Sequence, residues 1–283
     1  MDRVMLDGNG LGLTGLVRLA DAVAGPVVPP GALHRVRRAH ESAGRLAAQG
    51  QWYGRGTGVG AHRSVAVDPS DAAGHALRLL RSHAGGAGPV LPARQARALM
   101  AVRANQLLAA GSGIHPSFVT ALTEALRLGV HPVINEYGGV GTGDLTALAQ
   151  TGLTLIGERP WLTASPDAEL PAPVALRPGD SLALLSSNAL AVGRAALACH
   201  DLEEAASFAG QAAKQAERAA EAYRVVLACE LVAAVRALRL GPVEPSAPAF
   251  RVAAAALPAD MEDRALTGDV TTAMELLPQL ADL

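Results

Sequence analysis

The sequence contains few aromatic residues and few cysteines. Its 283 residues include three Phe, three Tyr, two Trp and two Cys, although half of all residues are hydrophobic. Most of that hydrophobic half is Ala, Leu and Val, a composition that suits closely packed helices better than a β-sandwich. The chain is therefore predicted to be mainly α, with enough residues for one large domain or two small ones.

An excess of charge of one sign is also absent. The chain carries 24 Lys and Arg residues against 26 Asp and Glu residues, a net charge of about −2. This balance argues against a nucleic-acid-binding or membrane-binding surface, so neither partner is expected. One short basic run, Arg35, Arg37 and Arg38, is predicted to be the solvated face of a helix.

The two cysteines and the apolar pattern bear on the compartment of the protein. Cys199 and Cys229 lie in Ala-rich helical sequence without C-x-x-C spacing, so we expect buried free thiols in a reducing compartment. The N-terminus lacks a signal-peptide pattern, and no uninterrupted apolar run of about 18 residues is present. A cytoplasmic protein without a membrane-spanning helix is expected. No residue spacing suggests a metal site, and no cofactor is predicted.

Glycine and proline clusters divide the chain into helical segments. The expected organisation is one mainly helical domain over residues 1–283, with a cleft-forming part (1–178), long bundle helices (179–242) and a C-terminal tail (243–283).

The longest predicted helices lie in the second half of the chain. Residues 180–200 are expected to form one apolar helix, and residues 201–240 are almost continuously helical. The tail is expected to end in one short helix near Met274 to Leu280. A helix as long as 201–240 suggests a bundle spine or a subunit contact, so we expect a homo-oligomer, a dimer or a tetramer; a hetero-oligomer stays open.

The most distinctive stretch is a glycine-dense turn, residues 135–144, that runs directly into an apolar helix. Its glycines allow positive φ angles and close approach by other groups. Thr142 and Asp144 lie in the first helical turn, where exposed N–H groups and the positive end of the helix dipole favour an anion. These two side chains can bind a substrate oxyanion; helix capping explains them nearly as well.

Several segments, all in one order, resemble the aromatic amino acid lyases, the family of histidine and phenylalanine ammonia-lyases. The resemblance implies a helical bundle of the ammonia-lyase (fumarase/aspartase-like) type and a small-molecule substrate. Matching segments cover most of residues 50–190 and 225–275. They include Tyr53-Gly54-x-Gly56-Thr57-Gly58-Val59-Gly60, Leu80-Arg81-Ser82-His83-Ala84-Gly85, Arg103-x-Asn105-x-Leu107, Gly129-Val130-x-Pro132 and Leu182-Ala183-Leu184-Leu185.

The chain departs from the family at its electrophile. That electrophile is a methylideneimidazolone ring, made when an Ala-Ser-Gly tripeptide cyclises and loses water. Here the loop Gly138 to Leu145 is one residue shorter and holds no serine, and Gly141-Thr142-Gly143 replaces the tripeptide. Threonine has a β-hydroxyl, but its methyl group would crowd a ring that must be attacked. We therefore expect no ring.

Two further departures affect the substrate site. The family's asparagine after Leu-Ala-Leu-Leu is replaced by Ser186-Ser187-Asn188, so the asparagine comes two places late. The chain is also about half the family's usual length, and the missing central helices would fall between about Leu202 and Ala220. In the family those helices supply the arginine that binds the substrate carboxylate, and no segment here matches them.

The resemblance implies catalytic roles for Tyr53 and His83. In the family the tyrosine is the general base or acid beside the β-carbon of the substrate. A phenol with the ordinary tyrosine pKa of about 10 is a weak base at neutral pH and a better proton donor. The substrate-binding residues expected beside them are Gly60, Thr142, Gly143, Asp144, Ser186 and Asn188.

Three functions remain open at this point. The favoured hypothesis is an ammonia-lyase-like enzyme of specialised metabolism, without the ring. It would use Tyr53 and His83 for elimination, isomerisation or cyclisation of a small-molecule or carrier-bound substrate. The second is a non-catalytic homologue that acts as a binding module or as a subunit of a hetero-oligomer. The third is a true aromatic amino acid ammonia-lyase or aminomutase.

Overall fold

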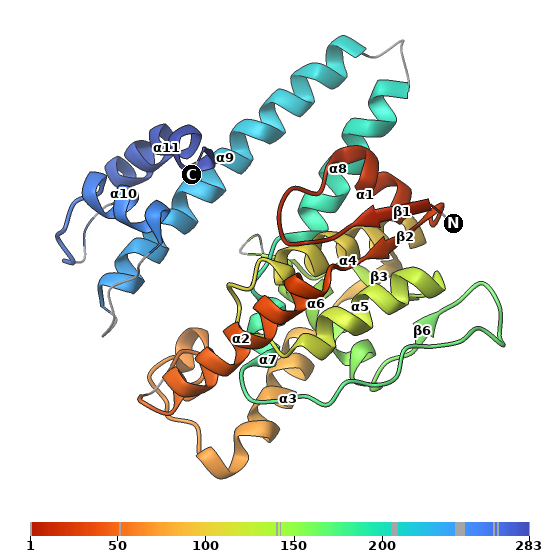
Figure 1. Cartoon of the computed structure of the whole chain (residues 1–283), viewed down its shortest axis with the longest axis horizontal. Coiled ribbons are helices and arrows are strands. Elements are labelled where there is room, and N and C mark those ends of the chain that lie inside the picture. Colours follow the sequence, from red (N-terminus) through yellow and green to blue (C-terminus); the bar gives the residue numbers. More distant parts are fainter. Residues whose placement is uncertain are drawn as a thin grey trace. The chain divides into compact units, whose positions relative to one another are not determined.

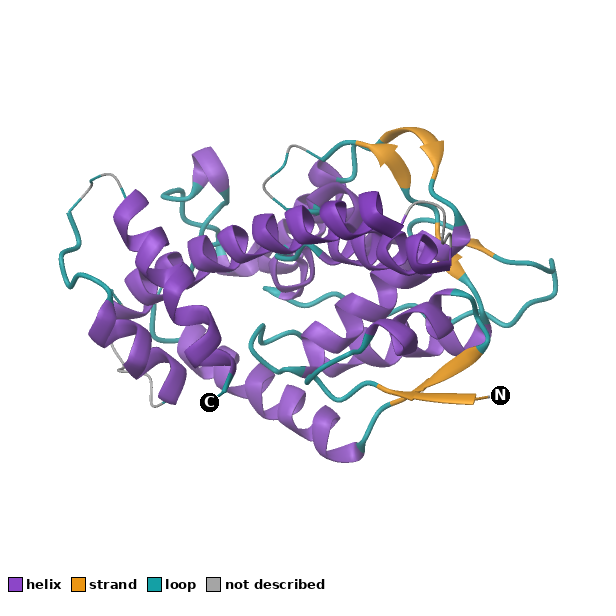
Figure 2. Cartoon of the chain, turned by 90° about the horizontal axis from the view of Figure 1, so that it is seen from above, coloured by secondary structure: helices purple, strands orange, loops and turns teal. Residues whose placement is uncertain are grey.

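The computed structural model describes residues 2–50, 52–139, 141, 143–204, 209–240, 247–262, 264 and 266–282. The chain divides into two compact units, Met1–Asp201 and Leu202–Leu283. Figures 1 and 2 show that helices make up most of both units and that the strands are short, which confirms the predicted mainly α class. One domain over 1–283, with internal boundaries at 178 and 242, stays a prediction.

Helix α4 (Ala93–Leu108) is the centre of the first unit. It packs against α1 (Leu13–Ala20), α2 (Pro30–Ala47) and α5 (Pro116–Leu128). Most of its residues are buried, including the charged Arg103. A helix that is buried all round must carry small and apolar residues on every face, and the Ala-rich sequence of α4 meets that requirement.

A second group of helices packs together beside the first. It consists of α3 (Ala72–His83), preceded by a 3₁₀ turn at Pro69–Asp71, together with α6 (Leu145–Leu155) and α7 (Asp180–Leu185). A Cβ on Gly152 of α6 would lie 2.9 Å from a methyl carbon of Leu80 and of Leu184. Glycine at this position therefore lets the three helices approach closely.

The described residues of the first unit also form three pairs of short strands. Strands β1 (Asp2–Met5) and β2 (Ala24–Val27) are parallel, in register Asp2 to Ala24. The pairs β3 (Ala87–Val90) with β5 (Asn135–Tyr137) and β4 (His131–Pro132) with β6 (Trp161–Leu162) are antiparallel. Both β2 and β3 read Ala-Gly-Pro-Val, and strands this short leave little periodic signal in the sequence.

The single apolar helix predicted over 180–200 is wrong, because the chain breaks there into two helices. Helix α7 ends at Leu185 and α8 (Ala189–Glu204) begins after the turn at Ser186–Asn188. By length and composition alone the stretch Asp180–Asp201 passes as a membrane span, which the sequence had not suggested. The buried core helix of a protein that does not enter a membrane passes the same test, so this stretch is weak evidence for a membrane span.

The second unit contains α9 (Ala209–Arg239), α10 (Pro248–Ala256) and α11 (Thr267–Ala281). The described part of the tail thus contains two helices, whereas one short helix near Met274 to Leu280 was expected. The small core of the second unit contains Ala228, Val232, Val235, Ala253, Leu257 and Ala273. The buried stripe of α9 passes through Ala228 and leaves the neighbouring Cys229 exposed, while Cys199 is half-buried, so the prediction of two buried thiols is wrong.

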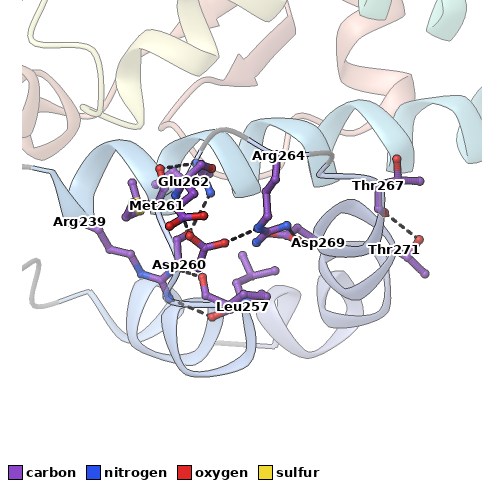
Figure 3. Close-up of polar contacts among 11 residues, drawn as sticks. Arg239, Leu257, Asp260, Met261, Glu262, Arg264, Thr267, Asp269 and Thr271 are labelled. Atoms are coloured by element: carbon purple, nitrogen blue, oxygen red, sulfur yellow. Dashed lines mark hydrogen bonds and ion pairs between the residues drawn. The ribbon is translucent and has the colours of Figure 1, made fainter.

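Arginines of α9 hold the connection between α10 and α11. Arg239 donates to the carbonyls of Ala254, Leu257 and Pro258, and Arg236 donates to those of residues 260–262. Arg264 forms ion pairs with Asp260 (2.5 Å) and Asp269 (2.8 Å), as Figure 3 shows in part. Guanidinium groups thereby satisfy the carbonyls that the C-terminus of α10 leaves open.

A pair of histidines joins α2 to the start of α5. The rings of His40 and His115 meet edge to face, with centroids 4.9 Å apart. Nδ1 of His40 lies 2.9 Å from the carbonyl oxygen of Gly113, and Nδ1 of His115 accepts from the N–H of Ser117 as the N-cap of α5. Burial lowers the pKa of His115 to about 4, and the charges of Arg177, His40 and Arg37 act in the same direction.

The free energy of unfolding is expected to fall as the pH drops from about 6.5 to about 4. Over this range His115 takes up a proton in the unfolded chain but not in the folded one, because its folded pKa is about 4. The His115→Asn variant keeps an N-cap acceptor and removes the imidazole, so its decline with falling pH should be shallower. Urea unfolding across this range measures the two slopes.

Asp180 has the opposite effect on the free energy of unfolding as the pH falls. Burial raises the pKa of its carboxyl, so the folded chain takes up this proton more readily than the unfolded chain. It is present in both proteins, so the difference between the two slopes isolates His115. Equal slopes in wild type and variant would contradict the assignment.

The loop before α1 is fixed against the end of α4 by a glycine. The N–H of Gly8 donates to Oδ1 of Asn105 at 3.1 Å, and Gly8 has φ +87°. A Cβ there would lie 2.4 Å from the backbone of Leu108 and Ala109.

The Gly8→Ala change is expected to reduce the free energy of unfolding by at least about 2 kcal/mol, from strain and overlap together. Nothing lies within 4 Å of a Cβ on Gly10, so Gly10→Ala is the matched control and should change stability by less than about 0.5 kcal/mol. Chemical denaturation measures both, and equal effects of the two changes would show that the close contact is not limiting.

Candidate functional site

Tyr53 lies on a tight turn whose carbonyls and glycines fix its position. The N–H groups of Arg55 and Gly56 donate to the carbonyl of Trp52, which closes the turn. The hydroxyl oxygen of Tyr53 accepts from the N–H of Gly60 at 3.0 Å, at the start of a 3₁₀ turn over Gly60–His62. Gly60, which was expected to bind substrate, thus holds the Tyr53 hydroxyl in this structure.

Gly54 explains why this turn needs glycine. Its φ is +68°, and a Cβ there would lie 2.5 Å from Cδ2 of Leu182 on α7. The turn therefore lies directly on α7, and a larger residue would push Tyr53 away from that helix.

A cleft of about 610 Å³ opens beside Tyr53. Its lining comes from the end of α2, the turn at Trp52–Arg55, the second half of α4, the loop at Gly111–Gly113 and one side of α7 with Ser186. Apolar groups make up much of the wall, among them Leu46, Trp52 and Leu182. This size and lining are typical of a small-molecule site.

The charges of the lining residues are of one sign. Arg55 and Arg103 line the cleft, and no Asp or Glu is among its lining residues in the described part of the chain. Arg103 is only 5% exposed. It donates to the carbonyls of Leu184 (3.1 Å) and Ala183 and to Oε1 of Gln106 (3.0 Å).

Burial lowers the pKa of Arg103 to about 10, so the group remains charged at neutral pH. Its acceptors are all neutral, and no carboxylate is among the partners the structure gives it. A buried cation held only by neutral acceptors is costly, and an anion in the cleft would offset part of that cost.

Ser186 lies on one wall of the cleft, whereas the neighbouring Ser187 is not among the lining residues. Oγ of Ser186, one of the residues predicted to bind substrate, donates to the carbonyl of Leu182 at 2.8 Å. Ser187 donates to Oε1 of Gln106 at 2.6 Å, which links the α7–α8 turn to α4.

Asp144 caps a helix through its carboxylate. Oδ2 of Asp144 accepts from the N–H groups of Leu190 (2.7 Å) and Ala191 (3.0 Å), the first turn of α8, and burial raises the pKa of its carboxyl. Its own N–H donates to the carbonyl of Ser187 at 2.9 Å. Asp144 is the N-cap residue of α6 rather than part of its first turn, and its side chain makes no capping bond to that helix. The carboxylate caps α8 instead, a role that the sequence did not predict.

The loop Gly138 to Leu145, which corresponds to the family's electrophile loop, borders a separate hollow of about 350 Å³. The residues that line this hollow include Tyr137, Gly138, Asp144 and Arg194. Gly143 has φ +122°, and a Cβ on it would be 3.6 Å from Oδ1 of Asn188. The late asparagine therefore does reach the loop. Thr142 lies outside the described residues.

The sequence of this loop departs from the one that forms the family's prosthetic ring. The ring is made from an Ala-Ser-Gly tripeptide, and Gly138 to Leu145 contains no serine. In the part of the chain that the structure describes, no group of three His, Cys, Asp or Glu side chains could hold a metal ion either.

His83 ends α3 and is half-buried. Its Nδ1 is 2.8 Å from the carbonyl oxygen of Leu79 and 3.2 Å from Oγ of Ser82. His83 does not line the cleft that contains Tyr53. Within one chain the two predicted catalytic residues are therefore not brought together over this cleft, and Gly143, Asp144 and Asn188 lie at the other hollow or beside its loop.

The sequence did not single out Arg55, Arg103 or Gln106 as site residues. Arg103 belongs to the Arg103-x-Asn105 segment, so the motif marked the position but not its exposure to the cleft. A charged residue in an apolar helix was the available signal.

Comparison with known proteins agrees with these observations. Residues 11–209 match the family model described as aromatic amino acid lyase. A histidine ammonia-lyase of Anaeromyxobacter dehalogenans is 35% identical over 216 residues, which cover 70% of this chain and 42% of that protein. The chain thus spans less than half the length of the curated relatives it matches first.

Solved structures share the fold. Ergothionase from Treponema denticola superposes with a TM-score of 0.66 at 29% identity, over 71% of this chain and 42% of that one. Tyrosine aminomutase from Streptomyces globisporus gives a TM-score of 0.66 over 98% of this chain and 59% of that one; at 22% identity it supports the fold alone. These neighbours confirm the predicted ammonia-lyase type of helical fold. The family model matches more than two thirds of this chain, and the chain therefore belongs to the aromatic amino acid lyase family.

Proposed function

We propose that this chain binds a small-molecule substrate in the Tyr53 cleft and acts on it by proton transfer, without a methylideneimidazolone ring. One observation carries the proposal: a phenol held by a backbone N–H stands on the wall of a cleft whose charged lining residues are both guanidinium groups. Because Oη of Tyr53 accepts from Gly60, its own proton remains free for a ligand.

The chemistry follows from this arrangement. The phenol donates its proton to a substrate atom that gains negative charge, and the fields of Arg55 and Arg103 stabilise that charge. Eliminations, isomerisations and cyclisations that proceed through an enolate-type intermediate develop such a charge. A catalytic role for His83 stays a proposal, and it requires a second copy of the chain to bring the imidazole to the cleft.

The relatives suggest the kind of substrate. The names of two of them, histidine ammonia-lyase and ergothionase, refer to histidine and to ergothioneine, two compounds with an imidazole-type ring. We extend only the ring to this chain: the proposed substrate carries an aromatic or imidazole group that packs against Trp52 and Leu46 in the cleft.

The non-catalytic alternative is favoured by the surface of α9. Tyr223, Val225, Val226 and Leu238 of this helix are each between 38% and 45% exposed. A helix with exposed apolar residues gains stability when another chain covers them. Self-association or a hetero-oligomeric partner therefore stays a proposal, as does the cytoplasmic location. A true ammonia-lyase would need the electrophile that the loop lacks.

The Tyr53→Phe variant tests the catalytic role, because it removes only the hydroxyl. With a substrate found by screening aromatic and imidazole-bearing carboxylates, we expect kcat to fall about 100-fold or more while KM changes little. Tyr137→Phe is the matched control, since Tyr137 is 62% exposed and does not line the cleft. Product formation by mass spectrometry is the readout.

Equal turnover by wild type and Tyr53→Phe would remove Tyr53 from the mechanism. Failure of every compound in the screen to react, with tight binding of one of them, would favour the non-catalytic alternative.

A further inference from the structure

We propose that the Tyr53 cleft contains an anion subsite, formed by Arg55 and Arg103, that binds the carboxylate of an apolar acid carrying no ammonium group. The inference rests on the proposed function in that it places the ligand in the same cleft. It adds the residues that recognise the ligand and the chemical class that they select.

Arg55 supplies an unused cation. Its side chain is half-buried, and its aliphatic stem packs on the turn before α7, where a Cβ on Gly179 would lie 3.1 Å from Cδ of Arg55. Within the described residues the structure gives its guanidinium no hydrogen bond and no ion pair. The stem is thus held in place while the charged end remains available to a ligand.

Arg103, on α4, supplies the second cation of the cleft lining. Three of its five N–H donors are used, on the carbonyls of Ala183 and Leu184 and on Gln106. Its position is fixed by these bonds, and its charge is not neutralised by them. A preorganised guanidinium of this kind favours a carboxylate ligand.

The cleft lacks a group that could receive an ammonium ion. No carboxylate is among its described lining residues. The acid nearest in sequence, Asp180, follows the lining residue Gly179, but its carboxylate accepts from the N–H groups of His115 (2.9 Å) and Arg177 (3.0 Å). The ammonium of an α-amino acid would therefore enter a cationic cleft without a partner, which disfavours a zwitterion relative to a simple acid.

Three ligands of one shape test the subsite: hydrocinnamate, its neutral amide hydrocinnamamide, and phenylalanine. Titration calorimetry on the full chain measures their dissociation constants. We expect hydrocinnamate to bind at least about tenfold more tightly than either of the others. Arg55→Gln should weaken hydrocinnamate binding by about tenfold, and Arg55→Lys should restore most of it, because lysine keeps the charge.

Arg63→Gln is the matched control. Arg63 is exposed on the same loop and does not line the cleft, so its loss removes the same charge without touching the subsite. Its affinity for hydrocinnamate should equal that of the wild type. Arg103 is left unchanged, because its removal would leave buried carbonyls of α7 without donors.

Each other outcome overturns the inference in a recognisable way. Equal binding of the three ligands would eliminate the anion subsite and leave the cleft of the proposed function intact. Hydrocinnamate binding that survives Arg55→Gln would place the carboxylate elsewhere. Binding of none of the three would overturn the inference, while a Tyr53-dependent turnover of another compound would still support the proposed function.

Discussion

The structure of the first unit depends on how Arg103 is accommodated. This arginine lies in the central helix α4, nearly excluded from water, and satisfies carbonyls of Ala183 and Leu184 at the end of α7. The same carbonyls would otherwise remain unpaired, because α7 stops where the chain turns into α8. One side chain therefore joins two helices far apart in sequence and fixes one wall of the cleft. The turn that carries Tyr53 closes another wall against α7, through the close contact of Gly54 with Leu182. The cleft is a product of these contacts, and its positive charge is a consequence of the residue that builds it.

We propose that this chain keeps the family's scaffold without the family's prosthetic ring. Gly54 and the carbonyl of Trp52 still shape the Tyr53 turn, and Asn188 still reaches the glycine loop from a position two residues late. The loop itself no longer contains a serine, and Asp144 is engaged in capping α8. The proposed chemistry uses a phenol and two guanidinium groups that line one cleft, which suits proton transfer to an anionic substrate better than attack on an electrophile. Packing accounts for the retained scaffold, since a larger residue in place of Gly54 would overlap with Leu182.

The sequence predicted the parts of the fold that repeat a period or begin with a strong cap. The bounds of α5 follow directly from the sequence, because Pro116 begins the helix and the αL residue Gly129 ends it. The break between α7 and α8 was missed, since Ser186–Asn188 carries no proline or glycine and only the tertiary contacts of Asp144 and Arg103 end the helix there. The short strands and the exposed Cys229 were missed because their environment is set by partners distant in sequence. The motif singled out Tyr53, whereas Arg55 and Arg103 come to line the same cleft only where α2, α4 and α7 meet. His83 does not line the Tyr53 cleft, and the sequence motif that contains it could not show this.

The central claim is that this member of the family works from its cleft without a prosthetic ring. The most direct measurement is the intact mass of the purified protein. We predict the full mass of the unmodified chain, with no loss of water between Gly138 and Leu145. A chain lighter by two waters, with the loss mapped by fragmentation to Gly141–Gly143, would show that threonine has replaced serine in the cyclisation and would contradict the account.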